Sequence, residues 1–116
     1  MKCVTVTPAS LVGNLNFYSV NITVANETPI QGVEITVSKY FNPQTNNFVD
    51  VCSIAYLSKI CNTKVITDAN GKASLCLIKG TYIITLKYNN YVNNVSISVF
   101  KNQDIKLPFF FYNLNM

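Results

Sequence analysis

The residues of this chain best suited to chemistry are its cysteines, Cys3, Cys52, Cys61 and Cys76. None of them forms the C-x-x-C pair common in zinc sites, so we expect no zinc site. Two alternatives remain open. The cysteines could form two disulfides in an oxidising compartment, or they could be four buried thiols that pack as small hydrophobic side chains. We predict disulfides, with Cys52–Cys61 closing a long loop and Cys3–Cys76 cross-linking the amino-terminal strand.

The chain offers little for catalysis or metal binding. It contains no histidine, which excludes Ser-His-Asp and Cys-His pairs and histidine metal sites. Its five carboxylates are too few and too scattered to suggest paired-carboxylate chemistry, and Asp68 belongs to a turn signal. We therefore expect a protein that is not an enzyme, with no cofactor and no bound metal.

The charge pattern bears on partners and location. The net charge is +4, but every basic residue is a spread-out lysine and there is no arginine, so nucleic-acid binding is not expected. No apolar run approaches the roughly 20 residues that span a membrane. No signal peptide is seen after Met1. A cytosolic chain, export by another route, and a mature fragment with an added start Met all remain open.

Three further groups of residues could mediate contacts. The N-glycosylation sequons begin at Asn21, Asn26 and Asn94, and all three are expected to be accessible. Phe109, Phe110 and Phe111 follow Pro108, and they either contact a partner or close the edge of the fold with one ring on the outer face. Tyr40, Tyr56 and Tyr91 lie near predicted loops, where they could stack against sugars or pack at the rim of the core.

The elements that must position these residues are strands. Residues 67–91 predict a turn, a strand, a second turn and a second strand, which we interpret as a central hairpin. Period-2 alternation predicts further strands over residues 2–7, 17–25, 30–40, 48–56, 92–100 and 104–112. Inward side chains are expected at Val20, Ile22, Val24, Val33, Ile35, Val37, Val95, Ile97 and Val99. About seven to nine short strands separated by turns are typical of an antiparallel β-sandwich, which predicts an all-β fold.

These residues also carry a resemblance. They include Val20, Ile22 and Val24, then Pro29-Ile30 and Gly32-Val33, and later Thr67-Asp68, Gly71, Leu77, Gly80, Tyr82, Ile84, Leu86 and Tyr91. Over about Phe17 to Leu107 the chain resembles the carboxypeptidase regulatory-like domains. Those domains share a prealbumin-like (transthyretin-like) sandwich with the collagen-adhesin B-type repeats. The resemblance implies an Ig-like or prealbumin-like sandwich with Tyr82 in its core.

The chain departs from that family in three places. Residues 1–16 lie outside the pattern and form an amino-terminal extension or an extra edge strand, whereas residues 17–116 form the sandwich domain. Residues 51–66 are longer than the family core needs. The first matching strand has no lysine, so the isopeptide bond of adhesin repeats is not expected.

The resemblance implies a structural or adhesive role. The leading hypothesis is a non-catalytic module at a cell or virion surface, which acts through protein–protein contacts or self-association. Residues 2–7 could pair as a strand with a neighbouring molecule. The alternative is an accessory module that binds a ligand such as carbohydrate beside a separate enzyme. An extracellular location follows from the disulfide prediction, and a cytoplasmic one stays open.

Overall fold

The computed structural model describes residues 17–54, 57–58 and 60–111. In chain order its elements are β1 (Phe17–Val24), β2 (Glu34–Asn42), β3 (Asn47–Asp50), the short 3-10 helix η1 (Val51–Ser53), β4 (Lys64–Ile66), β5 (Lys72–Ile78), β6 (Gly80–Tyr88), β7 (Tyr91–Val99) and β8 (Gln103–Leu107). Regular structure is therefore almost entirely strand, which confirms the predicted all-β class.

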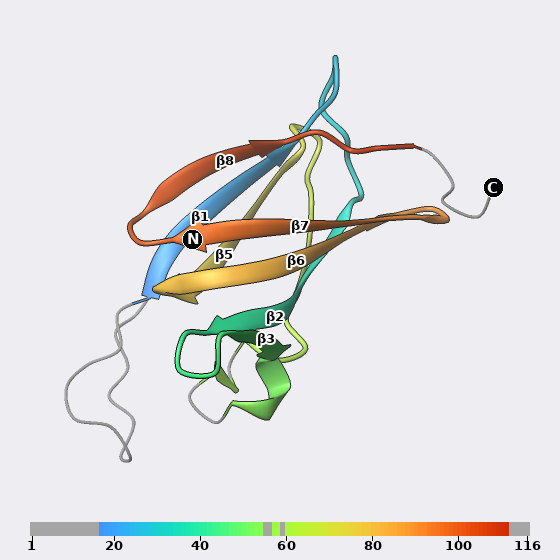
Figure 1. The fold of residues 1–116 in the computed structure, drawn as a ribbon. Helices are drawn as coiled ribbons and strands as arrows, with labels where there is room; N and C mark the ends of the chain where they lie inside the picture. Colours follow the sequence, from blue (N-terminus) through green and yellow to red (C-terminus); the bar gives the residue numbers. More distant parts are fainter. Residues whose placement is uncertain (1–16, 55–56, 59, 112–116) are drawn as a thin grey trace.

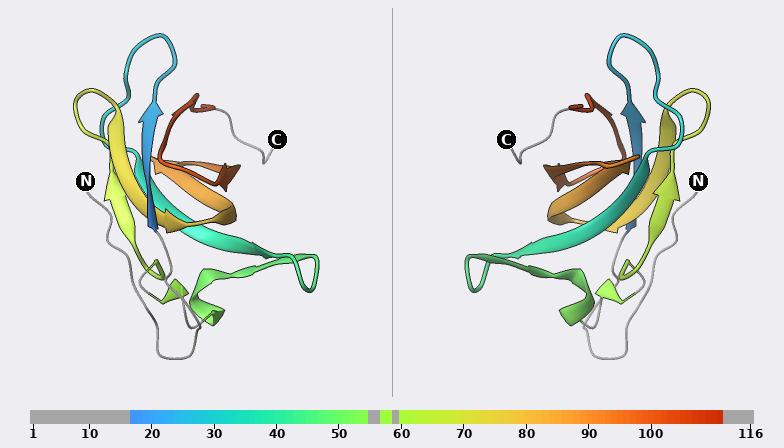
Figure 2. Two further views of the ribbon diagram at one scale, coloured as in Figure 1. Left: turned by 90° about the vertical axis from the view of Figure 1, so that its left-hand side faces the viewer. Right: turned by 90° about the vertical axis from the view of Figure 1, so that its right-hand side faces the viewer.

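The strands form two sheets packed face to face (Figures 1 and 2). One sheet has the order β5-β1-β8, and the other has the order β3-β2-β6-β7 with β4 also paired to β2. The predicted sandwich is confirmed, with one difference in strand direction. The pairing of β1 with β8 is parallel, whereas the other strand pairs among the described residues are antiparallel.

The two strands predicted within residues 67–91 are present, but the prediction that they pair as a hairpin is wrong. β5 pairs with β1, while β6 pairs with β2 and β7, so β5 and β6 belong to different sheets. Only Lys79 separates them, and the chain crosses there from one sheet to the other. The true hairpin joins β6 to β7 through Asn89 and Asn90, and Asn89 takes the turn conformation with φ 54°.

The segment after the loop at residues 43–46 is less extended than predicted. β3 ends at Asp50 and not near Tyr56, because the Asp50 carboxylate accepts a hydrogen bond from the Cys52 N–H and caps η1. β3 and β4 lie end to end along the same edge of β2. The chain between them carries Cys52 and Cys61.

The core lies between the sheets and follows the predicted alternation. The residues with no exposed surface include Val20, Ile22, Val24, Val33, Ile35, Leu57, Tyr82, Ile84 and Leu86. Tyr82 lies in the core as expected, and its hydroxyl donates a 2.7 Å hydrogen bond to the carbonyl of Ile78. The buried Tyr82 hydroxyl thus has a hydrogen-bond partner beside Lys79, where the chain crosses from one sheet to the other.

The last strand is shorter than the predicted range of 104–112. β8 ends at Leu107, because Pro108 has no N–H to continue a ladder. Residues 109–111 leave the sheet and cross one end of the sandwich, beyond β8 in Figure 1.

Candidate functional site

The carboxyl-terminal segment is held at one end of the sandwich by two asparagine side chains. Asn26, in the turn after β1, donates from Nδ2 to the carbonyl of Phe109 and accepts from the N–H of Phe109, both at 2.9 Å. Asn93 of β7 donates to the carbonyl of Phe110 at 3.2 Å and accepts from its N–H at 2.7 Å. Each amide therefore satisfies both backbone groups of one residue.

Aromatic rings converge around this segment. The ring of Phe109 is 2% exposed and contacts Tyr88 edge to face, with 6.0 Å between centroids. Phe111 contacts Phe109, Tyr88 and Tyr91 at centroid distances of 4.9, 6.0 and 5.5 Å. We call this surface the aromatic end, and it comprises Asn26, Ile30, Tyr88, Tyr91, Asn93 and Phe109–Phe111.

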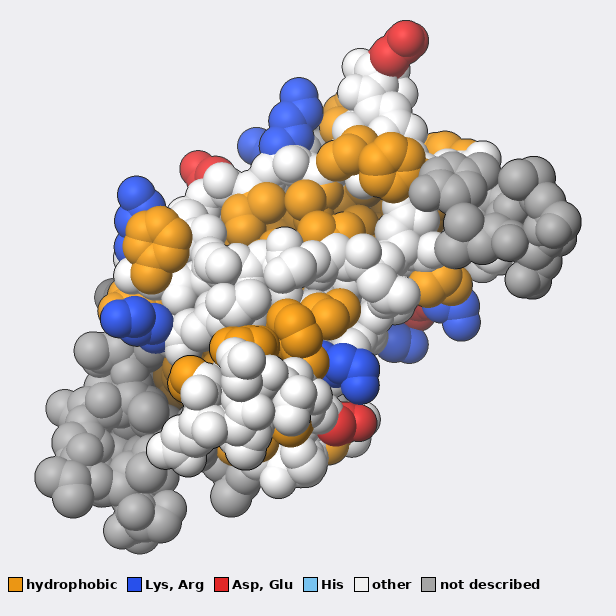
Figure 3. Space-filling model, in the orientation of Figure 1, with side chains coloured by type: hydrophobic (Ala, Val, Ile, Leu, Met, Phe, Trp, Pro, Cys, Tyr) orange, Lys and Arg blue, Asp and Glu red, His pale blue; other side chains and the backbone are white. Residues whose placement is uncertain are grey.

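The outer rings of the aromatic end remain accessible. Phe110 is 51% exposed and Phe111 is 46% exposed. Figure 3, drawn in the orientation of Figure 1, shows hydrophobic side chains at the surface of this end of the molecule. Phe109 is thus buried at this end of the fold, whereas the rings of Phe110 and Phe111 are both exposed, and a partner contact by the Phe triplet stays a prediction.

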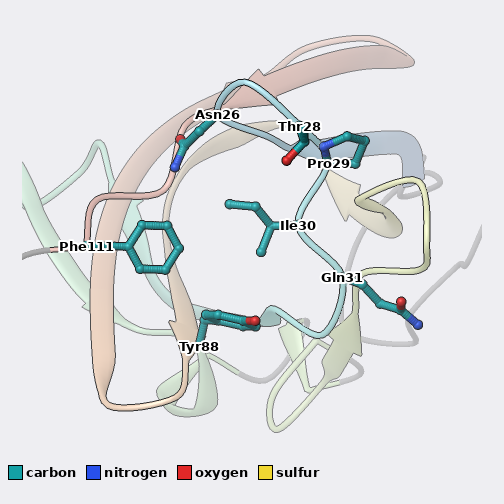
Figure 4. Close-up of a pocket in the computed structure, with 7 residues that line it drawn as sticks. All are labelled: Asn26, Thr28, Pro29, Ile30, Gln31, Tyr88 and Phe111. Atoms are coloured by element: carbon teal, nitrogen blue, oxygen red, sulfur yellow. The ribbon is translucent and has the colours of Figure 1, made fainter.

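A hollow adjoins these rings (Figure 4). Its volume is about 530 Å³, and it is lined by Asn26, Thr28, Pro29, Ile30, Gln31, Tyr88 and Phe111. Figure 4 shows Phe111, Ile30 and Tyr88 around one space, while the amide of Gln31 is directed away from it. None of the lining side chains is charged, so the hollow favours neutral ligands with apolar surface.

The structure places the cysteines partly as predicted. Cys52 and Cys61 form a disulfide, with their Cα atoms 4.8 Å apart. Cys76 on β5 is also disulfide-bonded. Cys3 lies outside the described residues, so its pairing with Cys76 stays a prediction.

The sequon asparagines differ in how far their amides are engaged. The Asn21 side chain donates to Asp104 at 2.9 Å and accepts from Ser74 at 2.7 Å. Asn26 is engaged at both amide atoms by Phe109. Asn94 accepts from Thr85 at 2.8 Å, and within the described part of the chain no hydrogen bond uses its Nδ2. All three residues are exposed, and their glycosylation stays a prediction.

The predicted tyrosines do not form one surface. Tyr91 belongs to the aromatic end, whereas Tyr40 packs on Tyr82 with centroids 5.4 Å apart. Tyr56 lies outside the described residues.

Sequence reasoning missed Tyr88 and Asn93, and it treated Asn26 only as a sequon. Asn26 and Phe109 are 83 residues apart, and no local pattern predicts that they meet.

Charged groups contribute a single ion pair among the described residues. Lys64 contacts Glu34 at 2.9 Å across the pair of β4 and β2, and this hydrogen bond and its charge lower the pKa of Glu34. The described residues contain no cluster of three or more His, Cys, Asp or Glu that could hold a metal ion. None of them forms a helix with the length and hydropathy of a membrane span.

The likeness of this chain to known proteins lies among solved structures. No protein-family model matches the chain, and no curated protein matches it. Among solved structures, the major pilin subunit of Bacillus cereus superposes with a TM-score of 0.48 at 17% identity, over 81% of this chain. The chain spans 29% of the length of that pilin subunit. The β-sandwich assignment rests on the sheets described above, and the resemblance to carboxypeptidase regulatory-like domains stays a prediction.

Proposed function

We propose that this protein is a non-catalytic structural or adhesive module of a cell or virion surface, which acts through protein–protein contacts. The observation that carries the proposal is the pair of exposed rings, Phe110 and Phe111, on a backbone fixed by Asn26 and Asn93. Aromatic side chains are enriched in protein interfaces. A fixed backbone reduces the ordering entropy that binding costs.

The disulfide between Cys52 and Cys61 supports an extracytoplasmic location. Disulfides persist in oxidising compartments and are rare in the cytosol. A secreted or surface-exposed chain is therefore the setting in which these contacts would form.

The test compares two phenylalanines of similar exposure. Phe110 is 51% exposed at the aromatic end, and Phe100 is 57% exposed in the turn between β7 and β8. We expect the wild-type chain to self-associate at concentrations of about 0.1–1 mM, the range of weak interfaces. Phe110→Asp should shift it to monomer, whereas Phe100→Asp should leave association unchanged.

Sedimentation velocity over a concentration series measures both variants, and urea unfolding checks that each remains folded. A wild-type chain that stays monomeric at about 1 mM would contradict self-association through this end. An equal loss of self-association in Phe110→Asp and Phe100→Asp would also contradict it. The loss would then follow from an added charge anywhere on the surface and not from this end of the molecule.

The second candidate function is binding of a neutral ligand such as carbohydrate beside a separate enzyme. It is favoured by the uncharged hollow of about 530 Å³, which combines the Asn26 amide with the rings of Tyr88 and Phe111. Sugars are bound by such combinations of amides and aromatic faces. A glycan array on which the wild-type chain binds nothing would count against this candidate.

A further inference from the structure

The carboxyl-terminal segment is bound to the sandwich as a peptide ligand is bound to a groove. β8 ends at Leu107, and the backbone of residues 109 and 110 bonds to asparagine side chains and not to a neighbouring strand. Removing this segment would therefore break no strand ladder among the described residues. Pro108 marks the point where the segment leaves the sheet.

Asn26 and Asn93 bond to the backbone of residues 109–110 from opposite sides. In an extended chain the N–H and C=O of successive residues point in opposite directions. Asn26 bonds Phe109 and Asn93 bonds Phe110, so the segment lies between the turn after β1 and strand β7. Bonds to backbone atoms do not depend on sequence.

Selectivity comes from the ring of Phe109. It is 2% exposed and contacts Tyr88, so this position of the groove is an aromatic pocket in the end of the core. Asn26, Tyr88 and Asn93 thus form a groove that holds the chain's own segment, with an aromatic side chain at the position of Phe109. The chain's own tail shows which sequence the groove accepts.

We propose that this groove also binds residues 108–111 of a second copy of the chain, so that copies associate by exchanging tails. Every copy carries both the groove and the tail, and the contacts are the same within one chain or between two. Exchange of identical elements is a low-cost route to association. This inference rests on the proposed function and names its partner and its contact.

Concentration decides which arrangement forms. A tail attached to its own groove has an effective concentration on the order of millimolar, so dilute chains remain closed on themselves. Exchange becomes competitive where copies are crowded together, as at a surface.

The test uses two complementary variants. Asn26→Ala with Asn93→Ala removes the groove contacts but leaves the tail intact, and Phe109→Ala weakens the tail but leaves the groove intact. Each variant alone should be mostly monomeric. Their equimolar mixture should form a one-to-one complex, with a dissociation constant at least about tenfold lower than for either variant alone.

The control is an equimolar mixture of the Phe109→Ala variant with a second variant, Asn47→Ala/Asn70→Ala. Those two asparagines lie in β3 and in the turn before β5, and their substitution leaves the groove and its occupying tail unchanged. That mixture should not form the complex. Sedimentation velocity and native mass spectrometry measure the species. A mixture of the complementary variants that sediments as two monomers would overturn the inference.

A second measurement applies if Phe109→Ala does not fold alone. A synthetic peptide of residues 107–116 should then restore its circular dichroism signal, and the same peptide with Ser at the Phe109 position should not. Absence of restoration would overturn tail exchange. If exchange fails while Phe110→Asp still abolishes wild-type association, the proposed function stands and only the exchange is wrong.

Discussion

Asp68 holds the turn before β5 through its carboxylate. Oδ1 accepts backbone hydrogen bonds from the N–H of Lys72 at 3.0 Å and of Asn70 at 2.9 Å. These bonds favour the charged carboxylate, so the pKa of Asp68 is lowered, with the bond from Lys72 as the larger cause. The sequence predicted a turn here, and the structure shows that the Asp68 side chain holds the backbone in that turn.

This lowered pKa makes a prediction about pH. A carboxyl whose pKa is lower in the folded state contributes stability above its unfolded pKa, and that stability is lost as pH falls through the folded pKa. We expect this contribution to be lost as the pH falls below about 4, the ordinary range of an aspartate carboxyl. Asp68→Asn keeps an acceptor oxygen but cannot titrate, so its stability should depend less on pH in that range.

Urea unfolding midpoints at pH 7, 4 and 2.5 measure the effect. Glu34, whose pKa Lys64 also lowers, remains in the variant and accounts for residual pH dependence. A variant with the full pH dependence of the wild type would show that Asp68 does not contribute.

At the scale of elements, the turn ending at Gly71 packs against the end of β1. The carbonyl of Gly71 accepts a 2.8 Å hydrogen bond from the N–H of Val24. Gly71 has φ +73°, and a Cβ there would lie 2.5 Å from the carbonyl oxygen of Val24. Gly32 also has positive φ, +88°, but its nearest neighbour would be 3.8 Å away, at Tyr88.

The two glycines make a matched comparison. Gly32→Ala should cost about 1–2 kcal/mol, the penalty of the left-handed conformation. Gly71→Ala adds a backbone overlap and should cost more than about 3 kcal/mol. Urea unfolding measures both, and equal costs would show that the turn before β5 moves freely away from β1.

The order of strands within the sheets also belongs to this scale. Period-2 alternation correctly predicted the inward faces of β1 and β2, and that of β7 at Ile97 and Val99. It did not predict that β5 and β6 join different sheets, nor that β8 lies parallel to β1. The alternation within one strand indicates which of its side chains face the core. That pattern does not depend on which other strand pairs with it, so it cannot predict the strand order.

At the scale of the whole molecule, the Cys52–Cys61 disulfide closes the excursion between β3 and β4. This excursion contributes Val51, Leu57 and Ile60 to the core. The cysteines are separated by nine positions in the sequence. Closing a loop of about ten residues reduces the entropy of the unfolded chain by an amount worth about 2–3 kcal/mol.

Replacing both cysteines therefore has an expected cost. Cys52→Ser/Cys61→Ser should lower the free energy of unfolding by about 2–3 kcal/mol and leave the two sheets intact. Urea unfolding measures the loss, and far-ultraviolet circular dichroism checks the sheets. A loss below about 0.5 kcal/mol would show that the excursion opens independently of the sandwich.

The amino-acid sequence by itself determined the strand class, the inward residues, the turns at residues 68–71 and 89–90, and the pairing of two nearby cysteines. Each depends on alternation, on turn residues or on short separation, which are local properties. The tertiary structure alone decided which sheet each strand joins and where the tail after Pro108 lies. The aromatic end brings Asn26 to Phe109 across 83 residues, and Asn93 to Phe110 across 17. An asparagine amide bonds equally well to any exposed backbone, so only the packed sheets determine which backbone it meets.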